Sequence, residues 1–163
     1  MTINKETVIT KDASNKKLLI TREFGGSIEK VWKAWTQPEL LDQWWAPKPW
    51  KAVTKSMDFK PGGFWLYCMQ GPEGEAHWAR ADYKTITEQK NFTYIDAFCD
   101  ENGTKTDFPG MDWKVDFVPV AAGTKVEIEI LFTTEEALKQ IIEMGFKEGF
   151  TAAHGNLDEL LEK

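Results

Sequence analysis

The chain has 163 residues, a formal net charge of −6, and 42% apolar and 28% charged residues. These values predict one soluble globular domain that is long enough to bury a sizeable core. The acidic balance argues against nucleic acid or a membrane surface as a partner, and no apolar run approaches the roughly 20 residues of a membrane span. Because no secretory segment precedes Lys16, we expect a cytoplasmic protein.

The first half of the chain predicts a strand followed by two short helices. Residues 1–15 are polar with a weak alternation, and we expect a loosely ordered segment, with an added edge strand as the alternative. A strand is predicted over residues 16–24, and a single domain over 16–163. Ser27 is a good N-cap for an amphipathic helix, and Pro38 fits the first turn of a second helix that ends on a Trp-Trp pair.

A period of two then replaces the helical period. Turn signals rich in Gly and Pro separate the apolar alternations, which predicts antiparallel hairpins in a meander. Cys68 and Cys99 fall inside these segments and are expected to be buried free thiols, with a disulfide or metal pair as the alternative. The predicted strands are 50–59, 64–70, 75–87, 91–100, 113–120 and 124–132.

One long amphipathic helix is predicted at the end of the chain, capped by Thr133 or Thr134. Its interior glycines, Gly145 and Gly149, each cost about 1 kcal/mol relative to Ala. Close approach to aromatic strand residues is the first explanation for them, and space for a ligand is the second. The fold class is therefore α+β: a curved antiparallel sheet of about six to seven strands, with the long helix across its concave face.

Three segments resemble a known family. They read EFGGSIEKVWKAWTQPELLDQWWAP over 23–47, DFKPGGFWLYCM over 58–69, and EEALKQIIEMGFKEGFTAAHGNLDELLEK over 135–163. They are similar to the domain related to the activator of the Hsp90 ATPase, which belongs to the START-like, helix-grip superfamily. The resemblance covers about residues 16–163 and implies a helix-grip fold with a central cavity. The chain departs from the family at Asp82, where a Gly is frequent, and we expect that carboxylate near the mouth or interior of the cavity.

The motifs exclude several common active sites, because the chain lacks a nucleophile elbow, a phosphate-binding loop, a dinucleotide fingerprint and a Cys/His metal cluster. We therefore expect no catalytic residue, cofactor or metal. His77 and His154 are the two histidines; His154 lies at the edge of the helical stripe, where it can reach either solvent or the cavity rim. Asp96 alternates with Tyr94 and Phe98 along a predicted strand, and a buried carboxylate needs a polar contact.

Aromatic residues make up 13% of the chain, and rings in such number either fill a solid core or wall a pocket. A pocket would have the usual ligand-site volume of about 300–1,000 Å³. The candidate lining residues, taken from the strand alternations, the family pattern and the last helix, are Trp45, Trp65, Tyr67, Met69, His77, Tyr94, Asp96, Phe98, Trp113, Phe146, Phe150 and His154.

The leading interpretation is a domain that binds a small apolar or aromatic molecule without turnover. The first alternative, implied by the family name, is an interaction module whose partner is a chaperone ATPase. The second is an enzyme of cyclase or hydrolase type that uses His77 or His154 with a neighbouring carboxylate.

Overall fold

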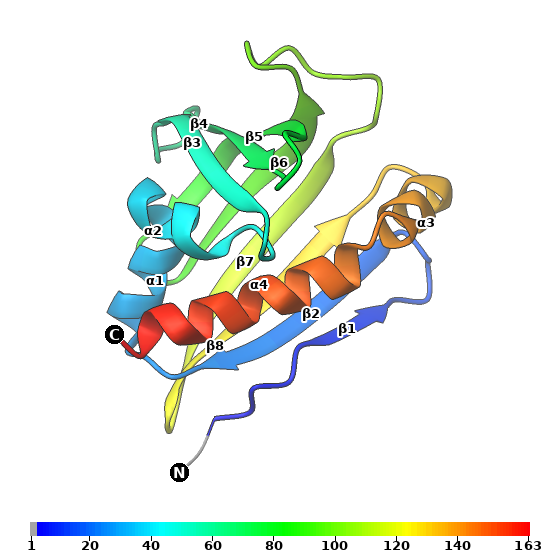
Figure 1. Cartoon of the computed structure of the whole chain (residues 1–163). Coiled ribbons are helices and arrows are strands. Elements are labelled where there is room, and N and C mark those ends of the chain that lie inside the picture. The colour runs from blue at the N-terminus through cyan, green and yellow to red at the C-terminus, as the bar shows by residue number, and fades with distance from the viewer. Residues whose placement is uncertain (1–2) are drawn as a thin grey trace.

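The computed structural model describes residues 3–163, in which eight strands form one antiparallel sheet with the order β1-β2-β8-β7-β6-β5-β4-β3 (Figure 1). Four helices accompany the sheet in the described part of the chain. The elements are β1 (Val8–Lys11), β2 (Lys17–Phe24), α1 (Ile28–Thr36), α2 (Pro38–Trp44), β3 (Lys51–Met57), β4 (Phe64–Gln70), β5 (Ala76–Thr87), β6 (Asn91–Cys99), β7 (Met111–Val120), β8 (Gly123–Leu131), α3 (Glu135–Glu143) and α4 (Phe146–Leu161).

The α+β class and the curved antiparallel sheet are confirmed, but the predicted strand number of six to seven is wrong. The additional strand is β1, which pairs with β2 at the sheet edge, Val8 opposite Thr21. Most of its side chains are exposed, so backbone hydrogen bonds rather than burial hold it, and the sequence alternation is correspondingly weak. Residues 1 and 2, which begin the segment expected to be loosely ordered, lie outside the described part.

The two short helices begin as their sequence predicts. The Ser27 side chain accepts a hydrogen bond from the backbone N–H of Lys30 at 3.2 Å, and Pro38 occupies the first turn of α2. Trp35 of α1 and Trp44 of α2 are buried against each other, with ring centroids 4.7 Å apart. This contact fixes the angle between the helices and directs the end of α2 toward the sheet.

The expectation of one terminal helix is wrong, because the chain forms α3 and α4 with a break between them. Thr134 caps α3, as predicted for this pair of threonines, by accepting a hydrogen bond from Ala137 N–H at 3.0 Å. Gly145 separates the two helices with a left-handed backbone (φ +92°), a conformation that glycine adopts without steric cost. Among the described residues, no atom lies within 4 Å of the Cβ that Gly145 would carry, and the Cβ of Gly149 would meet only Pro47 Cγ, at 3.7 Å, so close approach to strand residues explains neither glycine.

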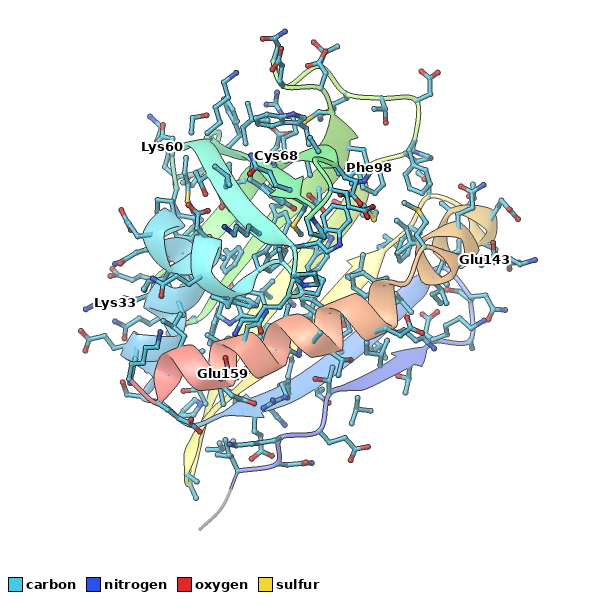
Figure 2. All side chains as sticks on the ribbon, viewed as in Figure 1. Lys33, Lys60, Cys68, Phe98, Glu143 and Glu159 are labelled. Carbon is cyan, nitrogen blue, oxygen red and sulfur yellow. The ribbon has the colours of Figure 1, made fainter. Side chains whose placement is uncertain are left out.

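Helix α4 lies across the concave face of the sheet, over β2, β7 and β8 (Figure 1). Its buried residues include Phe150, Ala153 and Leu157, which pack on the apolar sheet residues and on α1 and α2. Charged side chains such as Lys33, Glu143 and Glu159 project outward from the helices (Figure 2). The two cysteines are buried free thiols, as predicted. No helix within the described residues is long and apolar enough to cross a membrane.

Candidate functional site

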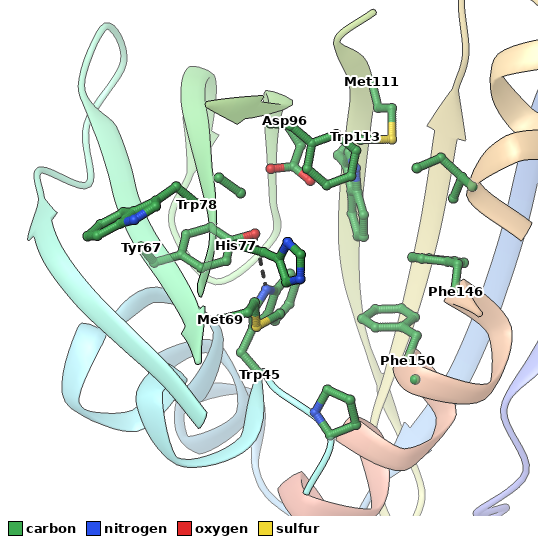
Figure 3. Close-up of a pocket in the computed structure, with 15 residues that line it drawn as sticks. Trp45, Tyr67, Met69, His77, Trp78, Asp96, Met111, Trp113, Phe146 and Phe150 are labelled. Atoms are coloured by element: carbon green, nitrogen blue, oxygen red, sulfur yellow. Dashed lines mark hydrogen bonds between the residues drawn. The ribbon is translucent and has the colours of Figure 1, made fainter. Parts of the chain in front are cut away.

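A cavity of about 220 Å³ lies between the concave side of the sheet and the helices (Figure 3). Strands β4 to β7 supply one wall, the segment after α2 supplies a second, and α3 and α4 supply the third. Its lining residues are Trp45, Pro47, Tyr67, Met69, His77, Trp78, Ala79, Asp96, Phe98, Met111, Trp113, Ile141, Phe146, Gly149 and Phe150. The volume is below the expected range of about 300–1,000 Å³ because aromatic rings occupy much of the hollow.

Three rings of the cavity lining pack against one another. The centroids of Trp45 and Trp113 are 6.1 Å apart, and each lies 5.8 Å from the centroid of Phe150. Trp45 is oriented further by its indole N–H, which donates a hydrogen bond to the Tyr67 hydroxyl at 3.2 Å. These contacts join the residue after α2 to β4, β7 and α4, so this wall depends on the tertiary arrangement.

Polar atoms are few in this apolar lining, and two of them have no hydrogen-bond partner. They are Oδ1 of Asp96 and the indole Nε1 of Trp113, both buried. The Asp96 carboxylate points into the cavity (Figure 3). Buried polar groups normally find partners, so the Asp96 carboxylate, which lines the cavity and is not fully paired, marks a place where a bound molecule can form a hydrogen bond.

The cavity changes the proton affinity of its ionisable groups. Burial, supplemented by the charge of Asp82, raises the pKa of Asp96 from 3.8 to about 7, against the opposing effect of the Ala97 backbone N–H. Burial, with the charge of Asp96, also raises the pKa of the Tyr67 hydroxyl well above its ordinary value. Near neutral pH the site therefore contains a carboxyl group that exchanges its proton readily and a phenol that stays neutral.

Nine of the twelve residues expected to line a cavity lie around this one: Trp45, Tyr67, Met69, His77, Asp96, Phe98, Trp113, Phe146 and Phe150. His77 is exposed and lies at the mouth, stacked on Trp50 with ring centroids 5.5 Å apart. Trp65 and Tyr94 do not line the cavity. Both have the expected inward orientation, but they are buried in the ring stack, Trp65 against Tyr67 and Tyr94 against Trp113.

His154 is also outside the cavity, and the expectation that it reaches solvent or the cavity rim is not met. It is fully buried, and its Nδ1 lies 2.9 Å from the Thr7 hydroxyl, so the N-terminal segment covers this face of α4. Burial and then the charge of Arg22 lower the pKa of His154 from 6.5 to about 3. The side chain is therefore a neutral core residue, and neighbouring rings, including Phe150 at 4.2 Å, separate it from the cavity.

The expectation for Asp82 is also wrong, because alternation along β5 directs it to the face opposite the cavity. Its carboxylate accepts hydrogen bonds from Arg80 at 2.6 and 3.1 Å and pairs with Lys105 at 3.2 Å. Among residues 3–163, no three His, Cys, Asp or Glu side chains are grouped so that they could hold a metal ion.

Several lining residues were not predicted, although some carried a signal. Ala79 alternates with His77 on β5, so the period of two places both on one face. Met111 was assigned to a loop but begins β7, two residues before Trp113. Ile141 was missed because the predicted apolar stripe of the terminal helix included Ile142 in its place. Trp78 faces away from the cavity (Figure 3), and its ring packs under Lys55 on the outer face of the sheet.

Comparison with known proteins agrees with this architecture. A family model described as activator of Hsp90 ATPase homolog 1-like protein matches residues 26–162. Among similar solved structures is that of protein Ms6760 from Mycobacterium smegmatis, which is 29% identical in sequence with a TM-score of 0.88. The match covers 96% of this chain and 97% of that chain. Protein NE0264 from Nitrosomonas europaea is 31% identical with a TM-score of 0.81, and the match covers 93% of this chain and 96% of that one.

A third structure, from Arthrobacter aurescens, is 29% identical with a TM-score of 0.88, over 95% of this chain and 91% of that chain. No curated protein matches the sequence. The family model spans most of the chain, and the similar structures share its helix-grip arrangement. The chain therefore belongs to the activator of Hsp90 ATPase homolog 1-like family, within the START-like, helix-grip superfamily.

Proposed function

We propose that this protein binds a small apolar or aromatic molecule in the cavity and does not convert it chemically. The observation that carries the proposal is the cavity itself: a half-open, mostly apolar pocket of about 220 Å³ whose lining includes the Asp96 carboxylate. Apolar walls with a few convergent polar groups are typical of small-molecule sites. A molecule of roughly one or two rings fits this volume.

Binding without turnover is favoured by the placement of the histidines. A general base needs a positioned partner within hydrogen-bond reach. His154 is separated from the cavity and contacts Thr7, while the exposed His77 stacks on Trp50 and makes no side-chain hydrogen bond among the described residues. Neither histidine forms the partnered pair that the hydrolase or cyclase alternative requires.

The experiment is a titration of the purified protein with a panel of small cyclic aromatics, flavonoids and lipids, followed by calorimetry and by tryptophan fluorescence. Trp45 and Trp113 report on occupancy because both line the cavity. The test variant is Ala79→Phe, which fills the cavity from β5. The control is Ala76→Phe, the same substitution on the exposed, opposite face of the same strand.

We expect saturable binding by the native protein and by Ala76→Phe, and a loss of at least about tenfold in affinity for Ala79→Phe. Equal affinity in both variants would place binding elsewhere, and an absence of saturable binding across the panel would overturn the proposal. Addition of the protein to Hsp90 tests the chaperone alternative. An altered rate of ATP turnover that Ala79→Phe leaves unchanged would favour an interaction module instead.

A further inference from the structure

The strand register places no hydrogen-bonding side chain directly opposite Asp96. Asp96 lies between Tyr94 and Phe98 on β6, and the residues opposite it are Ala81 of β5 and Met111 of β7. Neither side chain can donate a hydrogen bond to a carboxylate. The absence of a partner for Asp96 Oδ1 is therefore a consequence of the β-sheet sequence itself.

Within residues 3–163, no positively charged side chain pairs with this carboxylate. The cavity lining contains no Lys or Arg. The cations on the neighbouring part of the sheet, Arg80 and Lys105, pair with Asp82 on the opposite face. A buried carboxylate that lacks a counter-charge is costly, so a positively charged ligand group would gain from the interaction.

The walls around Asp96 suit an organic cation. Trp45, Tyr67, Trp113, Phe146 and Phe150 all line the cavity, and the electron-rich faces of such rings attract ammonium groups. The same rings contact the apolar part of a ligand by stacking and edge-to-face packing. An anionic ligand would meet the opposite situation, because it would face a carboxylate and ring faces of like electrostatic sign.

We propose that the ligand is a small aromatic or cyclic amine whose ammonium N–H donates to the Asp96 carboxylate while its ring packs among Trp45, Trp113 and Phe150. This inference rests on the proposed binding function and specifies its ligand class. Asp96 is the specificity-determining residue, and the aromatic wall supplies affinity that is independent of charge.

The ionisation of Asp96 makes this binding depend on pH. The pKa of Asp96 is about 7, so the carboxylate that an ammonium group needs is lost as pH falls below 7. The ionisable groups that face or influence Asp96 come from three strands, and the phenols among them remain neutral because burial raises the pKa of each. These groups are Tyr67 on β4, His77, Asp82 and Tyr83 on β5, and Tyr94 and Cys99 on β6.

Three probes of similar size and different charge test the inference: 2-phenylethylamine, propylbenzene and 3-phenylpropanoate. Titration calorimetry at pH 8 should show the amine binding on the order of tenfold more tightly than propylbenzene, and the anion binding least well. In Asp96→Asn the amine and propylbenzene should bind within about twofold of each other. The control is Asp112→Asn, a carboxylate on the outer face of β7 that pairs with Lys84, and it should keep the native preference.

The pH dependence of the native protein gives a second test that does not depend on the folding of a variant. Between pH 8 and pH 6 the affinity for 2-phenylethylamine, which stays protonated, should fall by about tenfold, while that for propylbenzene should not change. Propylbenzene or phenylpropanoate binding as tightly as the amine would overturn the inference and leave the proposed function intact. An amine preference that persists in Asp96→Asn would also overturn it. Binding of none of the three probes would overturn both.

Discussion

Asp96 should make the native protein less stable as pH rises, and Asp96→Asn should remove this effect. The folded-state pKa is about 7, above the ordinary 3.8, because burial disfavours the charged form. Between these two pH values the folded chain holds a proton that the unfolded chain has released. The free energy of unfolding therefore falls as pH rises through this window, and the full cost is present above pH 7.

The magnitude follows from the difference between the two pKa values. At about 1.4 kcal/mol for each tenfold change in proton affinity, raising the pKa from 3.8 to about 7 corresponds to about 4 kcal/mol. Asparagine has the same shape and does not ionise. Asp96→Asn should thus match the native protein near pH 4 and exceed its stability by up to about 4 kcal/mol at pH 8.

Urea unfolding of both proteins at several pH values between 4 and 8 measures this difference. Other titrating groups, including His154, contribute equally to both chains and cancel in the comparison. Asp112→Asn is the control, since Asp112 is half-exposed on the outer face of the sheet, and its effect should stay within about 1 kcal/mol. A stability difference for Asp96→Asn that does not change with pH would refute the reasoning.

Three further predictions concern the helices. His154 is neutral in the fold with a pKa of about 3, so the free energy of unfolding of the native protein should fall by up to about 5 kcal/mol as pH falls from 6.5 to 3. His154→Leu should lack that loss in acid unfolding. An unchanged dependence of its stability on pH would contradict the prediction. Asp158→Asn leaves the buried Arg22 without its counter-ion and should lower the free energy of unfolding, measured in urea, by about 3–5 kcal/mol. Glu159→Gln, which breaks an exposed pair with Lys48, should lower it by less than about 1 kcal/mol. Similar losses in the two variants would argue against burial as the cause. Gly145→Ala should destabilise the protein by about 1–2 kcal/mol, because Gly145 has a left-handed backbone conformation. Gly155→Ala lies inside a helix with open space around it and should stabilise the protein by up to about 1 kcal/mol. Thermal melts in which both variants shift in the same direction would contradict this prediction.

The architecture could be predicted where local pattern and fold agree. Ser27 and Pro38 identify the starts of α1 and α2, and alternation through residues such as Tyr67 and Trp113 places them on the inner face. The edge strand β1 was harder to predict because its exposed side chains carry little periodic signal. The helix break at Gly145 was also missed, since a glycine in an amphipathic stripe is compatible with either a continuous helix or a left-handed turn.

The candidate site was predictable in part for a similar reason. Strand alternation identifies Asp96 as inward-facing, but it does not reveal which residues lie opposite it, because the pairing with Ala81 and Met111 depends on the strand order and register. His154 shows the opposite case: its helical position is ambiguous, and the contact with Thr7, 147 positions away in the sequence, decides its environment. The free volume depends on how all the rings pack together, and no local pattern encodes that quantity.

A crystal structure of the protein soaked with propylbenzene shows whether the cavity accepts a ligand, since this probe needs only the apolar cavity. We expect ring-shaped density among Trp45, Trp113 and Phe150, with α4 retained across the sheet. Side chains that close the space and leave it dry, or a probe bound on the outer face of the sheet, would contradict this expectation.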